Sequence, residues 1–223
     1  MIQFTVPMRL SLIGMSGSGK SSWSIKLSDL GFKRFCCDDM IKKKLARDLT
    51  KPDGTRMKLG EWMGFPYDPD YEEREAKYLT CEIDVMTEII EYLESDEKQS
   101  EQHIVVDTTG SAIYTGEALL KRLRLCTRVV HLSTPPKVQE LMLKSYLNNR
   151  RPVLWRGLFE KAPKETNETA LARCYALLLS SREQLYERAA DVTIDYDTLN
   201  QDGLRVSSFL AIVKPLTEQN GIS

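Results

Sequence analysis

Short apolar runs alternate with longer segments of helical periodicity along this chain. The clearest buried strand is His103–Asp107, which is apolar and β-branched until it ends in an acid. Similar runs predict four more strands, at Met8–Ile13, Phe32–Cys37, Arg128–Leu132 and Val192–Tyr196. Five strands separated by helices predict an α/β fold with a parallel, doubly wound sheet. Ligands of such sheets bind at the carboxyl ends of the strands.

The segments between these strands predict helices. The longest runs from Tyr71 to Leu93, where apolar side chains recur near one face. Others are predicted from Ser22 to Gly31, Asp39 to Asp48, Glu117 to Leu125, Pro135 to Asn149, Thr169 to Ala190 and Leu204 to Thr217. Prolines and glycines between residues 50 and 70 predict turns and short helical pieces. We expect a single domain over residues 1–223, without internal repeats or low-complexity linkers.

A phosphate-binding loop joins the first strand to the first helix. Residues 14–21 have the pattern Gly-x-x-x-x-Gly-Lys-Ser, and the motif requires the strand before it and the helix after it. Its glycines let successive backbone N–H groups point at one anion, and the N-terminus of the helix adds its own. In this motif the lysine neutralises the outer phosphates and the serine hydroxyl ligates magnesium. We therefore predict that MgATP or a similar triphosphate binds at Gly14, Met15, Ser16, Gly17, Ser18, Gly19, Lys20, Ser21 and Ser22.

The charge balance and the cysteine spacing argue against several classes of protein. The 31 basic residues nearly balance the 32 acidic ones, which argues against a dedicated nucleic-acid or membrane surface. The 5 cysteines show no Cys-x-x-Cys spacing, which is typical of a reducing compartment and indicates neither disulfides nor a zinc site. No apolar run reaches membrane-spanning length, and the first strand begins almost at once. We expect a cytoplasmic protein that is a monomer or a homodimer.

Two carboxylates follow strands that lead to the same edge of the sheet. Asp107 is placed like the second acid of a phosphate-loop site, which orients magnesium, although an acid there can also cap a turn. Asp39 follows the second strand and heads a helix, so it is expected to point into the cleft as a base or orienter for a substrate hydroxyl. Helix capping is its alternative role. Its neighbour Asp38 is expected to face elsewhere.

A polar, proline-bearing segment spans Arg150 to Glu165. A stretch of this length without periodicity in a compact domain is usually a lid or an insertion. A lid arginine that reaches the transferred phosphate would help to exclude water and stabilise transition-state charge. The alternative is an ordinary surface arginine.

With these motifs in place, the chain resembles the shikimate kinase family, within the nucleoside monophosphate kinase-like small-molecule kinases. The stretches that carry the resemblance are Gly14–Ser22, Gly31–Ile41, Arg150–Leu154 and Arg182–Ile194. The resemblance implies a five-stranded parallel sheet in the order 2-3-1-4-5, a lid, and transfer of phosphate from ATP to a hydroxyl.

The resemblance also implies roles for individual residues. Asp39 matches the family's acceptor-binding aspartate, and Arg182 matches an arginine that grips the carboxylate of the acceptor. Arg151 matches the lid arginine, which joins Lys20 and Asp39 as a predicted catalytic residue. Lys144 stands where an arginine usually covers the adenine, and Gly110 falls in the acceptor-binding turn.

The chain departs from the family pattern in the acceptor half of the site. Cys37 replaces the first aspartate of an Asp-x-Asp pattern, so magnesium is assigned to Ser21 and Asp107. The family's triple-glycine turn is Thr108-Thr109-Gly110 here. The family's Phe-Arg acceptor segment has no clean match, and Arg74 is the nearest candidate. We expect acceptor binding over residues 50–95, a lid over 150–165, and an acceptor other than shikimate.

These features predict an ATP-dependent kinase that phosphorylates a hydroxyl of a small polar or anionic metabolite. A nucleotide or nucleoside kinase is an alternative, since the same sheet supports those acceptors. A nucleotide-binding regulatory protein with little turnover is a third reading, favoured by the missing first aspartate and the rebuilt turn.

Overall fold

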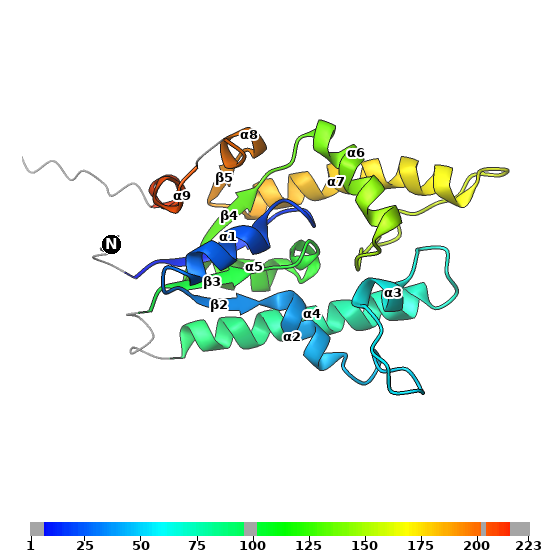
Figure 1. The fold of residues 1–223 in the computed structure, drawn as a ribbon, viewed down its shortest axis with the longest axis horizontal. Helices are drawn as coiled ribbons and strands as arrows, with labels where there is room; N and C mark the ends of the chain where they lie inside the picture. The colour runs from blue at the N-terminus through cyan, green and yellow to red at the C-terminus, as the bar shows by residue number, and fades with distance from the viewer. Residues whose placement is uncertain (1–6, 96–101, 202–203, 215–223) are drawn as a thin grey trace, which may run out of the picture.

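A five-stranded parallel sheet forms the centre of the protein (Figure 1). The computed structural model describes residues 7–95, 102–201 and 204–214. The strands are β1 (Arg9–Ile13), β2 (Lys33–Cys36), β3 (Ile104–Asp107), β4 (Arg128–Leu132) and β5 (Val192–Ile194). Their order is β2-β3-β1-β4-β5, and every neighbouring pair is parallel. The predicted fold class and strand order are confirmed.

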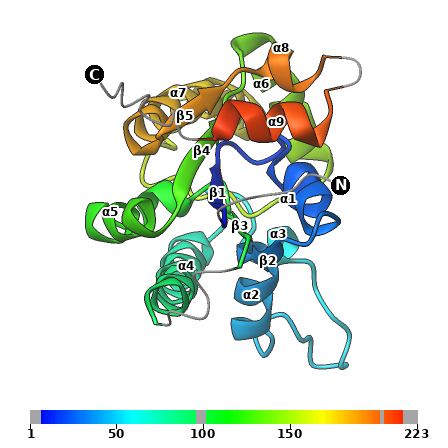
Figure 2. The same ribbon diagram turned by 90° about the vertical axis from the view of Figure 1, so that its left-hand side faces the viewer.

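Helices cover both faces of this sheet (Figure 2). Along the described chain they are α1 (Lys20–Ser28), α2 (Cys37–Lys44), α3 (Leu59–Met63), α4 (Tyr71–Glu94), the 3-10 turn η2 (Ala112–Tyr114), α5 (Glu117–Cys126), α6 (Pro136–Asn148), α7 (Asn167–Ala189), α8 (Tyr196–Leu199) and α9 (Val206–Val213). The helices α1 and α9 share one face, where Trp23 stacks on Phe209 at 4.3 Å. On the other face α4, α5 and α7 bury a larger apolar cluster. Burial on both faces explains why β3, which is buried throughout, is an apolar run until it ends in Asp107.

Most of the predicted elements are present, and the differences lie at their ends. The second strand stops at Cys36, and α2 begins at Cys37, two residues before the predicted helix. The last strand stops at Ile194, because the Asp195 carboxylate accepts a hydrogen bond from the Thr198 N–H (2.8 Å) and opens the short helix α8. The predicted end of the last helix, at Thr217, lies outside the described residues. None of the described helices is long and apolar enough to cross a membrane.

The segment between α6 and α7 packs more firmly than its composition suggests. Val153, Leu154 and Trp155 are all buried, with Trp155 only 1% exposed. The Tyr71 hydroxyl, at the start of α4, holds this segment: it lies 2.8 Å from the Val153 carbonyl and accepts the Trp155 N–H at 2.9 Å. It also contacts the Glu75 carboxylate at 2.7 Å. One buried hydroxyl therefore ties the predicted lid to the predicted acceptor-binding region.

Removal of that hydroxyl should destabilise the fold. We expect Tyr71→Phe to lower the free energy of unfolding by about 1–3 kcal/mol, because it leaves the buried Trp155 N–H without its acceptor. Urea unfolding monitored by fluorescence measures the change. Tyr67→Phe, in which the ring is 37% exposed, is the matched control and should shift stability by less than about 0.5 kcal/mol. Equal losses in both variants would contradict the role given to Tyr71.

Candidate active site

The phosphate-binding loop lies at the carboxyl end of β1, between β4 and the turn after β3. Gly14 has φ 140°, and a Cβ at this position would lie 2.6 Å from the Leu132 carbonyl oxygen at the end of β4. Gly110 meets the loop from the other side, since its Cβ would lie 3.0 Å from the Ser16 amide nitrogen. A side chain at Gly14 would collide with this backbone oxygen, and one at Gly110 would require the loop backbone to move by a few tenths of an ångström. The fold thus brings Gly110, which the resemblance assigns to the acceptor-binding turn, against the phosphate-binding loop.

Lys20 is the buried cation of the loop. It is 6% exposed, and its Nζ donates hydrogen bonds to the carbonyls of Gly14 (2.7 Å) and Met15 (2.9 Å). Burial lowers the pKa of Lys20 to about 8, and the nearby charges of Arg182 and Arg151 add to the shift. Asp107 and Asp38 act in the opposite direction. The lysine therefore titrates just above neutral pH.

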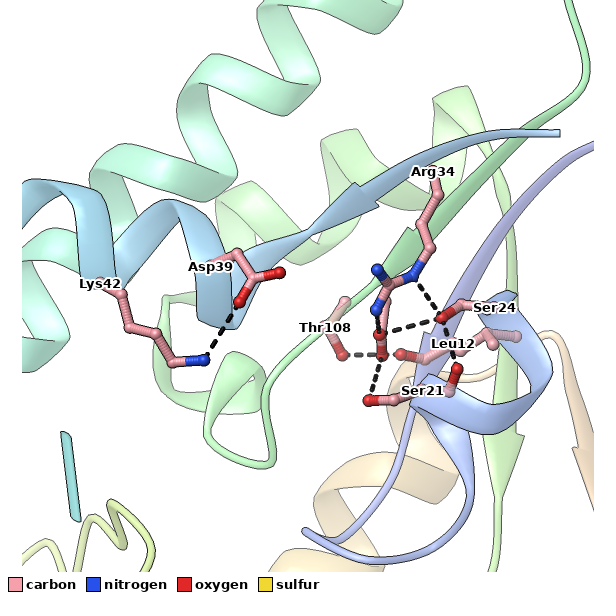
Figure 3. Close-up of polar contacts among 8 residues, drawn as sticks. Leu12, Ser21, Ser24, Arg34, Asp39, Lys42 and Thr108 are labelled. Carbon is pink, nitrogen blue, oxygen red and sulfur yellow. Dashed lines mark hydrogen bonds and ion pairs between the residues drawn. The ribbon is translucent and has the colours of Figure 1, made fainter. Parts of the chain in front are cut away.

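A polar cluster beside the loop gathers Ser21, Ser24 and Arg34, which Figure 3 labels, around the Asp107 carboxylate. Its Oδ1 lies 3.4 Å from the Ser21 hydroxyl, and its Oδ2 accepts from the Ser24 hydroxyl at 3.0 Å. Arg34 reaches across from β2 and pairs with the same Oδ2 at 2.6 Å, while its Nε donates to Ser24 at 2.7 Å. The two predicted metal ligands, Ser21 and Asp107, are thus brought together.

Arg34 was missed by sequence reasoning. It lies in β2, which reads Lys-Arg-Phe-Cys with Lys33 exposed and Arg34 half-buried, so a second charged residue stands beside it and the sequence alone does not single out Arg34. Its guanidinium neutralises one oxygen of Asp107 and leaves Oδ1 toward Ser21. Only one face of the Asp107 carboxylate is therefore available to a ligand.

The structure reverses the placement expected for the paired aspartates. Asp38 lines a cavity of about 490 Å³ together with Lys20 and Ser21, and burial raises the pKa of its carboxyl. Asp39 lies outside the cavity lining, with its side chain 58% exposed and paired to Lys42 at 3.1 Å (Figure 3). That hydrogen bond lowers the pKa of Asp39. Because α2 begins at Cys37, both acids lie in its first turn, about 100° apart around the axis, and the first one points inward.

Arg182 connects the turn after β3 with the predicted lid. It is 4% exposed and lines the cavity. Its guanidinium donates to the carbonyls of Gly110 (3.2 Å) and Leu154 (2.7 Å), and to the Tyr114 hydroxyl (3.3 Å). All three of its nitrogens have protein partners, so its first role is to hold this wall of the cavity together.

Of the other basic residues predicted for the site, Arg151 lines the cavity, whereas Arg74 and Lys144 do not. Arg151 lines the cavity and donates to the Ser16 hydroxyl at 3.3 Å, directly over the loop. Arg74 points away from the cavity, because it donates to the Trp62 carbonyl (2.9 Å) and pairs with Asp70 (2.7 Å). Lys144 is exposed on α6 and is not part of the cavity lining.

The cavity is strongly basic. Its described lining includes six basic side chains and a single acidic one, Asp38. The basic residues are Lys20, Lys42, Lys58, Arg150, Arg151 and Arg182. This excess of positive charge suits a polyphosphate together with a second anionic or polar molecule.

Comparisons with known proteins find similarity at the level of structure. No protein-family model matches the sequence, and no curated protein matches it. Shikimate kinase from Acinetobacter baumannii, in complex with shikimate, is 24% identical, with 93% of this chain and 89% of that chain covered and a TM-score of 0.57.

Two further shikimate kinases give similar values. The enzyme from Bacteroides thetaiotaomicron is 16% identical, with 92% and 94% of the two chains covered and a TM-score of 0.56. The enzyme from Aquifex aeolicus is 18% identical, with 92% and 96% covered and a TM-score of 0.56. At these identities the likeness is one of fold: the chain has the α/β kinase fold of these proteins.

Proposed function

We propose that the protein is an ATP-dependent small-molecule kinase, which transfers the γ-phosphate to a hydroxyl of a small polar or anionic metabolite. The observation that carries the proposal is the single basic cavity in which Lys20, Asp38 and Gly110 meet. Phosphoryl transfer needs a held triphosphate, an acceptor in line with it, and a group that orients the acceptor hydroxyl. The kinase fold of the similar structures supports the same reaction class.

The donor half uses the phosphate-binding loop. In this proposal Gly14–Ser22 holds the phosphates, and Lys20 leaves its two carbonyl partners to bind the outer phosphate oxygens. Arg151 of the lid, over residues 150–165, supplies further charge and excludes water. We keep Lys144 as the side chain that covers the adenine when the lid closes.

The residues beside the loop suit magnesium. Mg²⁺ prefers oxygen ligands and usually binds through one or two carboxylates, substrate phosphates and water. The Ser21 hydroxyl and Oδ1 of Asp107, which accepts a hydrogen bond from it at 3.4 Å, offer that donor set. No group of three or more acidic, histidine or cysteine side chains that could hold a metal occurs in the described parts of the chain. When bound, Mg²⁺ would neutralise charge on the phosphates.

The acceptor half uses Asp38 in place of the predicted Asp39. The acceptor oxygen attacks the γ-phosphorus, the bond from that phosphorus to the bridging oxygen breaks, and ADP leaves. The hydroxyl proton passes to the Asp38 carboxylate, whose raised pKa favours its uptake. Gly110 and Arg182 form part of the acceptor wall. Acceptor binding also involves the region of residues 50–95. Within that region Arg74 has a structural role, because its guanidinium is bonded to Trp62 and Asp70.

The turn after β3 argues for an acceptor other than shikimate. Thr108 and Thr109 place two branched side chains in the cavity wall, at the position of the family's glycine turn. The test is ADP release from MgATP against a panel of shikimate, cyclic polyols, sugar acids and nucleosides. Acceptor-dependent release establishes the kinase and identifies its substrate class. Tight ATP binding without release across the panel would instead favour a regulatory nucleotide-binding protein.

The two aspartates give opposite predictions. Asp38→Asn should lower kcat by about 100-fold or more with the best panel acceptor, because it removes the proton-accepting carboxylate. Asp39→Asn should change kcat by less than about threefold, since its carboxylate is exposed and paired with Lys42. Steady-state ADP release measures both. A large loss in Asp39→Asn with a small one in Asp38→Asn would restore the placement expected from sequence.

The titration of Lys20 should appear in nucleotide binding. The phosphates need the charged ammonium, so the affinity for MgATP should be constant below about pH 7. It should weaken above pH 8, by up to about tenfold per pH unit, because the pKa of the free lysine is about 8. Equilibrium titration with a fluorescent ATP analogue between pH 6.5 and 9.5 tests this expectation. Lys20→Met should bind weakly at every pH, and a pH dependence that survives in this variant would point to another group.

A further inference from the structure

A buried glutamate lies beneath the turn that forms the acceptor wall. Glu82, in the middle of α4, is 0% exposed. Its Oε1 accepts hydrogen bonds from the hydroxyls of Thr109 and Ser111, the latter at 3.0 Å. Its Oε2 is buried and has no hydrogen-bond partner among the described residues. A carboxyl group buried in this way is costly for the fold, and this cost calls for an explanation.

The surroundings of Glu82 come from three elements of the site. Asp38 and the buried Cys37 lie nearby on α2, Tyr78 precedes it by one turn on α4, and Arg182 approaches from α7. Burial raises the pKa of Glu82 to about 7, against the two hydroxyl hydrogen bonds and Arg182, which lower it. Above that pH the group is a carboxylate, and a carboxylate only accepts hydrogen bonds.

The carboxylate therefore decides where the hydroxyl protons of the turn point. Thr109 and Ser111 direct theirs to Glu82, and Thr108 directs its own to the Leu12 carbonyl at 2.7 Å. All three of these residues line the cavity. With the protons turned inward, any lone pair that these hydroxyl oxygens still present to the cavity can only accept a hydrogen bond. One lone pair of Thr109 Oγ1 is already taken by the Ser111 N–H at 3.1 Å.

Negative groups of a substrate have other places to bind in the cavity. Four basic side chains reach the cavity from elements away from the turn: Lys20 from the loop and α1, Lys42 from α2, Lys58 before α3, and Arg151 from the 150–165 segment. Arg182 lies against the turn, but all three of its nitrogens already donate to protein oxygens. A carboxylate or phosphate against Thr109 and Ser111 would meet oxygen lone pairs, which repel it. A hydroxyl or ammonium group there would donate to them.

We propose that Glu82 fixes the hydrogen-bonding polarity of this turn, so that the part of the acceptor that faces Thr109 and Ser111 carries hydrogen-bond donors, namely hydroxyl or ammonium groups. The acceptor is then a molecule with donors at one end and its anionic group near the lysines. This inference rests on the proposed kinase function. Glu82 acts through the two hydroxyls, and is a positioning residue.

The first experiment needs no acceptor. In Glu82→Met the two hydroxyls lose their common partner, and the Ser111 N–H, which donates to Thr109 Oγ1 at 3.1 Å, loses its fixed acceptor. Hydrogen exchange followed by mass spectrometry should show faster exchange in the peptide that spans residues 108–114, by about tenfold or more. The affinity for MgATP should change by less than about twofold, since the hydrogen bonds of Glu82 go to Thr109 and Ser111 and not to the phosphate-binding loop. Unchanged exchange in the turn would overturn the role of Glu82.

The second experiment tests whether the turn accepts hydrogen bonds from the acceptor. The probe is the panel compound that gives the highest acceptor-dependent ADP release, compared at pH 8.5 with analogues in which fluorine or an amino group replaces one hydroxyl at a time. Fluorine cannot donate. At one position other than the phosphorylated hydroxyl, fluorine should lower kcat/KM by about tenfold or more, and the amino group should be tolerated.

Glu82→Met should reduce this discrimination to less than about threefold, because the freed hydroxyl protons can donate to fluorine. Glu91→Met, at an exposed position on the same helix, is the matched control and should discriminate like the wild type. The proposal fails if the wild type tolerates fluorine at every such position, or if both variants discriminate equally. If no panel compound is phosphorylated, the acceptor part falls with the proposed function, while hydrogen exchange still decides whether Glu82 holds the turn.

Discussion

The close packing of the phosphate-binding loop is the constraint on which the site depends. At Gly14 the loop backbone approaches the Leu132 carbonyl, and at Ser16 it meets both Gly110 and the Arg151 guanidinium. Three separate parts of the chain, the end of β4, the turn after β3 and the lid segment, are therefore located against one short loop. A parallel sheet makes this possible, because all of its strands end at the same edge. A side chain at either glycine would push these parts away from the phosphates.

The donor half of the site could be predicted from sequence because its chemistry is carried by the backbone. A glycine-rich turn between a strand and a helix has essentially one way to bind an anion, so the spacing of Gly14 to Ser21 specifies the geometry. The buried strands were predictable for a related reason: burial on both faces makes them apolar runs. Asp107 followed from its place at the end of such a run, and the structure brings it to Ser21.

The acceptor half could not be predicted in the same way, because it depends on the direction of side chains. A shift of two residues in the start of α2 rotates its first turn, and this alone exchanges Asp38 with Asp39 in the cavity. Sequence periodicity does not locate helix ends to that precision. Arg74 shows the same limit: its carbonyl partner at Trp62 and its partner Asp70 are set by the local path of the chain. The burial of Trp155 in the 150–165 segment likewise depends on a contact made far along the sequence, with Tyr71.

The two halves are joined by groups that a motif does not record. Arg182 bonds the carbonyls of Gly110 and Leu154, so the acceptor turn and the base of the lid share one buried cation. A movement of the lid that draws Leu154 away must break a charge-assisted hydrogen bond in a buried place, or carry the turn with it. Movement of the turn together with the lid costs less free energy, because breaking the hydrogen bond would leave guanidinium N–H groups buried without an acceptor. The proposed lid and the proposed acceptor wall are therefore linked by the hydrogen bonds of Arg182, and the residue that the family resemblance assigns to the substrate here binds the protein's own carbonyls.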